Sequence, residues 1–396
     1  MSLIKLYVAL GLVTAHLVVV ASGAEITAVE KNALEAARQG EVVLLSELWP
    51  QQRELPLVPI KISDAHGPQF LLSDKPEYFY TGNGIALQEE VKPGVARLYI
   101  YHVPEPTNGP KTISAVIENL GSRPLKFRFL RRAFPKPGRD YQRIGKAGLV
   151  EFFNSKPEKT NRRLAPGGRM VIDPQMDAAT ATTDELAHGF YEFEINQPAR
   201  ITVFQRSPEQ SSLTVIDQLP RLPFDLPGRK ANGAGRGLFL TSDFKVVGEP
   251  GFVLDTAHGP MRLVLADGRT DPAIKGRDGI EQMEAVKDSG NYGVLYRIRI
   301  KYASSDGRGL ALLMTKSGKG GQWCGSQAAA VQVNRGIWAG GTVAIPADRV
   351  SYGNPGETVL IQKFPPLRHG RTGTIDILYS PPGASCMPTP LLLVPY

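Results

Sequence analysis

The chain has 396 residues and a net charge of +8 at neutral pH, with 41 glycines, 32 prolines and two cysteines. This length is sufficient for two domains of ordinary size. Two cysteines alone do not make a zinc site, and long stretches of helical periodicity are scarce.

A secretory signal peptide is expected at the N-terminus. A short basic start at residues 1–5 precedes an apolar run at 6–20 and the small residues Ala21-Ser22-Gly23-Ala24. This apolar run is shorter than the ~20 residues that a membrane-spanning helix needs. We therefore expect cleavage near Ala24 and export, giving a secreted or envelope-associated protein without a transmembrane span in the mature chain. Retention of the segment as an anchor is the alternative.

The next segment, 25–54, is expected to form an N-terminal extension that begins with a short helix. Thr27 and Glu30 have the spacing of a capping box, and Gly40 lies where such a helix would have ended.

Most of the remaining chain is predicted to form short strands. Residues 95–103 (VARLYIYHV) and 294–302 (VLYRIRIKY) alternate with a period of two. In the second run, Arg297, Arg299 and Lys301 lie opposite the apolar residues. Runs of this kind, separated by turn residues, are typical of β-sandwiches.

A hairpin is predicted over residues 112–129 (TISAVIENLGSRPLKFRF). Asn119 and Gly121 supply turn chemistry between two alternating runs. We expect these two runs to be antiparallel neighbours.

Three short patterns of the first half of the chain recur in the same order in the second half, which indicates an internal duplication. They are Asp64-Ala65-His66-Gly67-Pro68 and Asp255-Thr256-Ala257-His258-Gly259-Pro260, Gly94-Val95 and Gly293-Val294, and His188-Gly189 and His369-Gly370. We therefore predict a mainly β fold with two related antiparallel β-sandwich domains. The predicted organisation is a signal peptide at 1–24, an N-terminal extension at 25–54, a first β-sandwich domain at 55–206, a Pro/Gly-rich linker or arm at 207–235, and a second β-sandwich domain at 236–396.

The predicted hairpin, and the run Leu164-Ala165-Pro166-Gly167-Gly168 before a further strand, resemble features of bacterial immunoglobulin-like sandwiches. The order of elements across the mature chain loosely resembles a family of exported bacterial proteins of unknown function, built from immunoglobulin-like or jelly-roll-like β-domains. This resemblance implies an exported protein with two β-domains and carries no active-site motif.

Positive charge is concentrated in the basic segment, residues 123–169, which has 14 Lys and Arg residues against three acidic residues. Within it, PLKFRFLRRAFPKPGR alternates basic and aromatic residues and continues into an expected loop. If the basic side chains converge, they can hold an anionic polymer by charge-assisted contacts. The alternative is that Phe127 and Phe129 face the core and the basic residues are only the solvated face of a strand. The candidate contact residues are Lys126, Arg128, Arg131, Arg132, Lys136 and Arg139.

No catalytic motif is recognisable. The chain lacks a Gly-x-Ser-x-Gly elbow, a complete phosphate-binding loop and the Asp-Thr/Ser-Gly sequence of aspartic proteases. No cofactor is predicted. Histidines near glycines are weak candidates for metal ligands, because two imidazoles per site are fewer than the usual three or four. These candidates are His66, His188, His258 and His369.

Cys324 and Cys386 are the only thiols. An even pair in an oxidising compartment is expected to form one disulfide bond.

These observations favour an exported, non-catalytic binding or structural protein of the cell envelope or extracellular matrix, with an anionic polysaccharide or another envelope polymer as partner. Export disfavours nucleic acid. One alternative is a polysaccharide hydrolase or lyase with its site between the two β-domains. A second alternative is an exported metal-binding protein.

Overall fold

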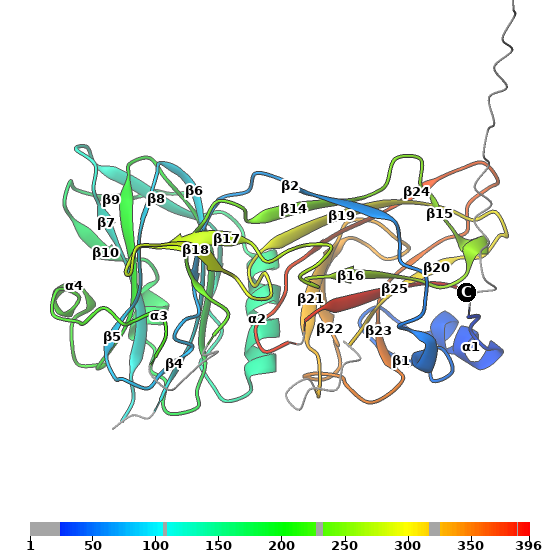
Figure 1. Ribbon diagram of the computed structural model, residues 1–396, viewed down its shortest axis with the longest axis horizontal. Coiled ribbons are helices and arrows are strands. Elements are labelled where there is room, and N and C mark those ends of the chain that lie inside the picture. The colour runs from blue at the N-terminus through cyan, green and yellow to red at the C-terminus, as the bar shows by residue number, and fades with distance from the viewer. Residues whose placement is uncertain (1–23, 106–108, 227–232, 317–324, 386) are drawn as a thin grey trace, which may run out of the picture.

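The computed structural model describes residues 24–105, 109–226, 233–316, 325–385 and 387–396. The fold is mainly β, as predicted, and the strands form four sheets (Figure 1). The helices are α1 (Ala28–Ala36), α2 (Tyr141–Asn154), α3 (Pro174–Ala178) and α4 (Ser212–Val215), with short 3-10 turns η1 (Trp49–Gln51) and η2 (Thr256–His258). No helix in these ranges has the length and apolar character that crossing a membrane requires.

Two of the sheets are formed mostly by the first half of the chain. Sheet 1 contains, in spatial order, β10 (Arg169–Val171), β7 (Thr112–Asn119), β12 (Ala199–Arg206) and β5 (Gly84–Val91). Sheet 2 contains β18 (Met283–Lys287), β17 (Lys275–Asp278), β13 (Arg236–Phe239), β3 (Gln69–Ser73), β6 (Gly94–Pro104), β11 (Ala187–Ile195), β8 (Leu125–Ala133) and β9 (Arg162–Leu164), and β4 (Tyr78–Phe79) also pairs with β6.

The other two sheets are formed mostly by the second half. Sheet 3 contains β2 (Ile60–Asp64), β14 (Asp243–Gly248), β19 (Leu295–Ala303), β24 (Gly373–Tyr379), β21 (Ala329–Val333) and β22 (Gly341–Ile345), and β15 (Leu254–Asp255) also pairs with β19. Sheet 4 contains β1 (Val42–Leu44), β23 (Glu357–Phe364), β20 (Leu310–Thr315), β25 (Thr389–Pro395) and β16 (Met261–Leu265).

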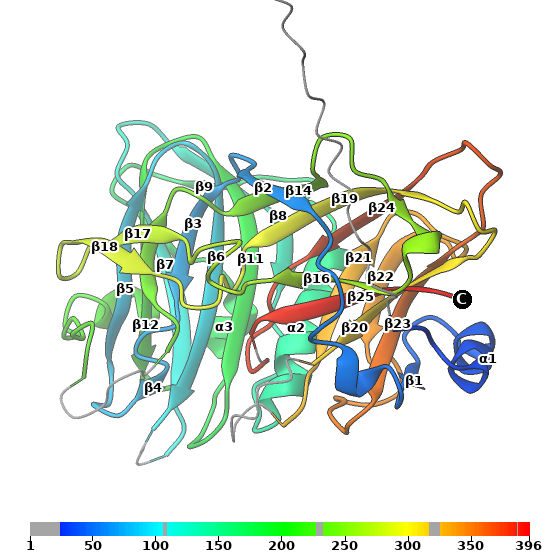
Figure 2. The same ribbon diagram turned by 45° about the vertical axis from the view of Figure 1, so that its right-hand side comes forward.

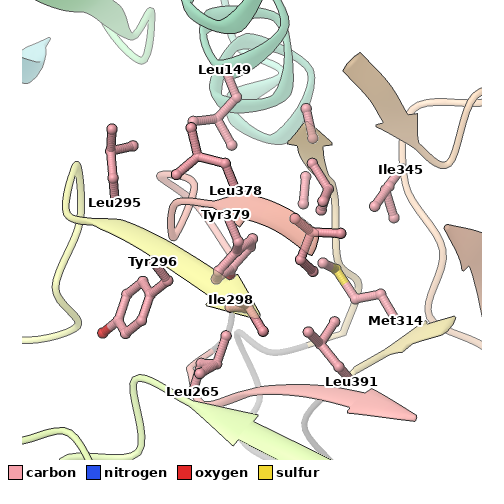
Figure 3. Packing of buried hydrophobic residues seen from close by; sticks show 14 of the residues in the cluster. Leu149, Leu265, Leu295, Tyr296, Ile298, Met314, Ile345, Leu378, Tyr379 and Leu391 are labelled. Carbon is pink, nitrogen blue, oxygen red and sulfur yellow. The ribbon is translucent and has the colours of Figure 1, made fainter. Parts of the chain in front are cut away.

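The sheets pack as layers with α2 in the middle. Sheets 1 and 2 share one apolar cluster, and a second cluster joins sheets 3 and 4 to α2 and to the other face of sheet 2. Figure 3 shows Leu149 of α2 pointing toward Leu378 of β24, with Tyr379 and Ile298 among the side chains below it. Strand β6 is consequently buried on both faces. Its residues alternate with the expected period of two, so that Tyr99 and Tyr101 lie in one apolar cluster and Leu98 and Ile100 in the other.

The strand order of one half is repeated in the other. We call β3–β12 the first repeat and β14–β25 the second repeat. The order β3-β6-β11-β8-β9 in sheet 2 matches β14-β19-β24-β21-β22 in sheet 3, and β5-β12-β7-β10 in sheet 1 matches β16-β25-β20-β23 in sheet 4. The matched pairs β3–β6 and β14–β19 are both parallel, as are β4–β6 and β15–β19, and the remaining matched pairs are antiparallel. This equivalence supports the predicted duplication.

One of the three sequence patterns used to predict the duplication does not mark equivalent positions. The pattern at Asp64 precedes β3, whose counterpart is β14, whereas the pattern at Asp255 precedes β16, whose counterpart is β5. Gly94 and Gly293, in contrast, lie at or just before the starts of the equivalent strands β6 and β19.

The two repeats exchange edge strands. Strand β2 directly precedes β3 in the chain but pairs with β14 of the second repeat, with Ile62 opposite Val246. Strand β13 directly precedes β14 but pairs with β3 of the first repeat, with Leu238 opposite Leu71. Figures 1 and 2 both show β2 lying along β14. Backbone ladders therefore join the predicted domain at 55–206 to the predicted domain at 236–396. The predicted domain boundaries stay predictions.

Two local predictions are confirmed. Helix α1 has the predicted capping box, because the Thr27 hydroxyl accepts from the Glu30 amide and the Glu30 carboxylate accepts from the Thr27 amide. In β19, Tyr296 and Ile298 are buried, whereas Arg297, Arg299 and Lys301 are exposed.

The predicted hairpin over 112–129 was wrong. Strand β7 pairs with β12 and β10 in sheet 1, while β8 pairs with β11 and β9 in sheet 2. The connection therefore crosses from one sheet to the facing one. The Asn119 side chain stabilises the crossing by donating to the carbonyl oxygens of Arg123 and Leu164.

The expected loop after β8 is in part a helix. Residues 141–154 form α2, which begins at the cap residue Asp140, whose carboxylate accepts from the Arg143 amide. One face of α2 packs on β8 and β11 of the first repeat and the other contacts β21 and β22 of the second. This segment therefore lies between the repeats and is not an extended basic loop.

Candidate functional site

The outer face of sheet 3, which faces away from sheet 4, carries a group of exposed basic side chains. Period-two alternation in β19 directs Tyr296 and Ile298 into the core and Arg297, Arg299 and Lys301 to the opposite side. We call the group on this side the basic face. Its members are Lys61, Lys245, Arg297, Arg299, Lys301 and Arg335.

Strand register brings these cations together. Lys245 of β14 is directly opposite Arg297 of β19 in a parallel ladder, and on the same strand Val247 is opposite both Lys61 and Arg299. Neighbouring strands lie about 4.8 Å apart, so these side chains form one surface. The sequence showed only the β19 residues of this group, because the other members come from segments that are distant in the chain.

Most of the positive charge on this surface is not neutralised. Arg297 binds Asp243 at 2.8 Å and Arg299 binds Asp376 at 2.9 Å. The other four cations, namely Lys61, Lys245, Lys301 and Arg335, are exposed and form no ion pair with any described residue.

A pocket of about 580 Å³ lies on the basic face. Lys245, Arg299, Lys301 and Arg335 line it, together with two acidic residues, Asp376 and Glu249. Asp376 is the partner of Arg299, and Glu249 lies with Phe252 in the loop that follows β14. Exposed ammonium and guanidinium groups are suited to carboxylate, sulfate and phosphate groups, and the guanidinium can bind them with two parallel hydrogen bonds. The arrangement can therefore hold anionic groups.

The basic residues predicted from β8 have several different environments. Phe127 and Phe129 are buried in the core that sheets 1 and 2 share. Arg128 is paired with Glu194 at 2.7 Å, and Arg132 with Asp173 at 2.5 Å. These two arginines are therefore neutralised within the fold.

Arg131 lies on the side of sheet 2 that faces the second repeat. Its guanidinium lies over the Phe152 ring, 5.1 Å from the centroid, and its Nη1 is buried with no hydrogen-bond partner among the described residues. Burial lowers the pKa of Arg131, Glu192 opposes this effect, and the like charges of Arg97 and Arg297 add to it.

Lys126, Lys136 and Arg139 are exposed and form no ion pair within the described ranges. Lys126 is at the start of β8, whereas Lys136 and Arg139 follow its end. Of the six predicted residues, two are therefore paired with carboxylates, one is packed on an aromatic ring, and three are exposed at the two ends of β8. Their role as contacts for an anionic polymer stays a prediction.

A second candidate site is the carboxyl cluster, formed by Asp74, Glu77 and Asp288. Asp74 and Asp288 are 5% and 0% exposed. The Ala234 amide donates to Asp74 Oδ2, and the Tyr292 amide to Asp288 Oδ1. Asp74 Oδ1, Asp288 Oδ2 and the nearby Tyr99 hydroxyl have no hydrogen-bond partner in the described part of the chain.

Burial raises the pKa of all three carboxyl groups. The pKa of Glu77 rises to about 7 through burial, and those of Asp74 and Asp288 rise well above their usual range. The charge of Glu77 adds to the effect at Asp74. A carboxyl group with a pKa near 7 is suited to general acid–base catalysis. None of the three members lines the pocket on the basic face or the pockets on sheets 1 and 4.

The candidate histidine ligands do not form a metal site. His188 is buried on β11, with Nδ1 2.8 Å from the Ile100 carbonyl oxygen and its ring packed on Tyr99, so it is a core residue. His66, His258 and His369 are exposed. Within the described ranges, no three His, Cys, Asp or Glu side chains are arranged to hold a metal ion.

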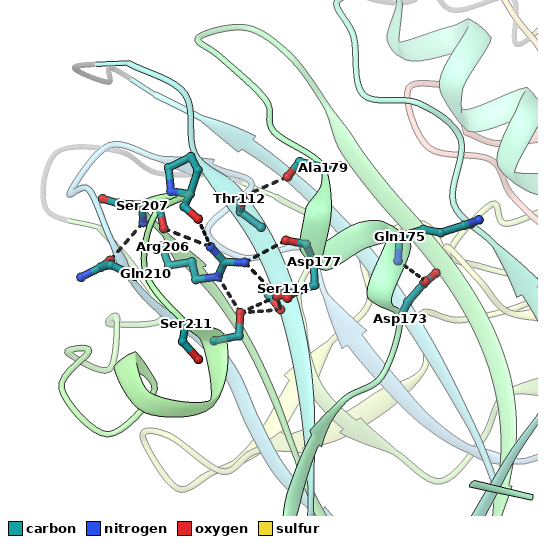
Figure 4. A network of polar contacts seen from close by, with 12 residues as sticks. Thr112, Ser114, Asp173, Gln175, Asp177, Ala179, Arg206, Ser207, Gln210 and Ser211 are labelled. Atoms are coloured by element: carbon teal, nitrogen blue, oxygen red, sulfur yellow. Dashed lines mark hydrogen bonds and ion pairs between the residues drawn. The ribbon is translucent and has the colours of Figure 1, made fainter.

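A further polar network joins sheet 1 to helices α3 and α4 (Figure 4). Arg206 donates to Asp177, Ser212 and neighbouring carbonyl oxygens, and Ser114 and Ser212 both donate to the Asp177 carboxylate. No imidazole takes part in this set of bonds. The network anchors the segment that follows β12.

Cys324 and Cys386, the predicted disulfide pair, lie outside the described residues. The disulfide therefore stays a prediction.

No protein-family model matches the chain, and no curated protein matches it either.

Proposed function

We propose that the protein is an exported, non-catalytic binding protein that holds an anionic polymer, such as an acidic polysaccharide of the cell envelope or extracellular matrix, on the basic face. The observation that carries this proposal is the set of exposed cations without ion-pair partners around a pocket of about 580 Å³.

The spacing of the cations suits a polymer. They lie on three adjacent strands and on the residues after a fourth, so charged groups repeated along a chain can contact several of them at once. Because the side chains are exposed, their attraction for anions is screened over about 8–10 Å at physiological ionic strength. Binding should therefore weaken as salt rises.

The test is a binding titration of the mature protein with polygalacturonate and with uncharged dextran, repeated at increasing salt. The double variant Lys245→Glu/Lys301→Glu should lower the affinity for polygalacturonate about tenfold or more, since 1.4 kcal/mol of lost attraction and added repulsion corresponds to tenfold. Dextran should bind weakly to every variant.

The matched control is Lys126→Glu/Lys136→Glu, which makes the same change in net charge at exposed residues of the basic segment. It should retain wild-type affinity. Equal losses in both double variants would mean that only net charge matters, and absence of any salt-sensitive binding would refute the proposal.

A polysaccharide hydrolase or lyase is the second candidate, favoured by the pKa of about 7 for Glu77 in the carboxyl cluster. This function predicts release of reducing ends from an acidic polysaccharide by the wild type and none by Glu77→Gln. Turnover that survives Glu77→Gln, or none in the wild type, rules out this candidate.

A further inference from the structure

A second pocket, of about 640 Å³, lies on sheet 4, on the opposite side of the second repeat from the basic face. It is bounded by the segment before β2 and by the edge strand β16. That segment continues the sheet, because the Val58 amide donates to the Arg262 carbonyl oxygen and the Arg262 amide donates to that of Pro56. Helix α1 and the residues after β1 cover the neighbouring part of the same sheet face.

The wall of this pocket is largely apolar. Leu57, Val58, Val264 and Pro390 contribute to it, and Val264 and Pro390 are opposite each other in the ladder between β16 and β25. Leu57 is 55% exposed, which leaves a large apolar side chain in water beside the pocket. Burying such a side chain under a ligand is favourable by about 25 cal/mol per Å² of apolar surface.

Four cations surround this apolar wall. Arg53, Arg262, Arg269 and Lys316 line the pocket, and none of them forms an ion pair with a described residue. Arg262 Nε donates to the Leu55 carbonyl oxygen and Lys316 Nζ donates to those of Gly325 and Gly353, so their partners are neutral.

The one acidic residue of the lining, Asp267, is already engaged. Its carboxylate accepts from the amides of Arg269 and Thr270 and from the Thr270 hydroxyl within the turn after β16. These bonds hold the turn that carries Arg269. With four cations and one carboxylate in its lining, the pocket has an excess of positive charge.

We propose that this pocket binds a small amphipathic organic anion, with an apolar body against Leu57 and Val264 and a carboxylate, sulfonate or phosphate group between Arg53 and Arg269. Volumes of about 300–1,000 Å³, apolar walls and a few directed polar groups are typical of sites for small ligands. The combination of apolar wall and cationic rim distinguishes this ligand from the polymer assigned to the basic face. The inference does not depend on that proposed function.

The probe is decanoate, measured by isothermal titration calorimetry on the mature protein. Decanol supplies the same apolar chain without charge, and acetate supplies the charge without the chain. Decanoate should bind with one site per chain, whereas decanol and acetate should bind at least about tenfold more weakly. Equal binding of decanol would show that the cations of the pocket do not contribute to binding. Equal binding of acetate would show that the apolar wall does not contribute. Either result would overturn the proposal.

Two variants locate the site. Arg53→Glu/Arg269→Glu changes exposed residues and should weaken decanoate binding at least about tenfold, while Leu57→Ser should weaken it through the apolar contact. Lys245→Glu/Lys301→Glu is the control and should keep wild-type affinity for decanoate. The site is elsewhere if both pocket variants bind as the wild type does.

Vesicles of phosphatidylglycerol distinguish a free ligand from a membrane surface. The proposal expects decanoate to bind whether or not vesicles are present, and the protein to remain in the supernatant when vesicles are sedimented. If the wild-type protein sediments with the vesicles and the Arg53→Glu/Arg269→Glu variant does not, the pocket binds a lipid surface. That result would overturn the proposal of a small ligand.

Discussion

Arg97 and Asp243 form a buried ion pair that joins the two repeats. Arg97 Nη1 of β6 lies 2.7 Å from Asp243 Oδ1 of β14, and the two side chains are 0% and 4% exposed. Asp243 also binds Arg297 of β19, and Arg97 also binds Glu192 of β11. Burial alone would raise the pKa of Asp243, but the two arginines hold it below its usual range.

Asp243→Asn should therefore destabilise the protein by about 3 kcal/mol or more, because it leaves the Arg97 guanidinium buried with only Glu192 as counter-charge. Urea unfolding followed by circular dichroism measures the free energy of unfolding. The control is Glu90→Gln, which removes an exposed pair with Arg200 and should cost less than about 1 kcal/mol. Similar losses in both variants would mean that the Arg97–Asp243 pair has no special role between the repeats.

The parts of the fold that follow from local patterns were predictable from the sequence. The capping box of α1 and the two faces of β19 depend on residues a few positions apart, and both were predicted correctly. The pairing of β7 and β8 was not, since the same turn residues occur in a hairpin and in a crossing between facing sheets. The strand exchange of β2 and β13 has no local signature, because it depends on which edge each strand reaches.

Glu77→Gln should change how stability depends on pH. The pKa of Glu77 is about 7 in the folded protein, against an ordinary value of 4.5. The protonated form is thus favoured by folding, so its contribution is fully present below pH 4.5 and is lost as pH rises through 7. Glu77→Gln should match the wild type at pH 4 and exceed its free energy of unfolding at pH 8 by on the order of 2 kcal/mol.

Chemical denaturation at a series of pH values provides this measurement. Glu54→Gln, at an exposed residue of the N-terminal segment, is the control and should reproduce the wild-type curve. A Glu77→Gln curve parallel to that of the wild type over the whole range would show that the carboxyl group is ionised in the folded protein at neutral pH.

His188 and His102 should remain neutral in the folded protein well below pH 6. Burial lowers the pKa of His188 to about 4 and that of His102 to about 3. Unfolded chains bind protons at these histidines below about pH 6.5, so stability should fall as pH drops from 6.5 toward 4. Long-range ¹H–¹⁵N NMR correlations report each imidazole directly, and a titration midpoint above 6 at either residue would contradict the burial of its ring.

The candidate site was only partly predictable. The alternation in β19 indicated that Arg297, Arg299 and Lys301 share one side, but Lys61 and Lys245 join them only through the register of β2, β14 and β19. In the basic segment, charge density alone did not reveal that Arg128 and Arg132 have carboxylate partners distant in the chain. The density of Lys and Arg along the sequence does not show which of these cations are paired with carboxylates in the fold. The charge of a binding surface comes from the cations that are exposed and unpaired.

Helix α2 also escaped prediction, although a signal was present. Asp140 is a suitable cap, and Ile144, Gly148 and Phe152 follow at intervals of four on a single helical face. The glycines and the surrounding charges obscured this pattern. In the structure Gly148 is required for close packing, because a Cβ there would lie 2.5 Å from Cδ2 and Nε2 of His188.

Gly148→Ala should therefore destabilise the protein by about 1–3 kcal/mol, through overpacking of α2 against β11. Helix propensity alone predicts the opposite sign, since alanine is favoured over glycine within a helix by about 1 kcal/mol. Arg143→Ala, at an exposed position of the same helix, is the control and should change the free energy of unfolding by less than about 0.5 kcal/mol. If Gly148→Ala were as stable as the wild type or more so, there would be room for a methyl group between α2 and β11. The helix would then not be packed tightly in the layer that joins the repeats.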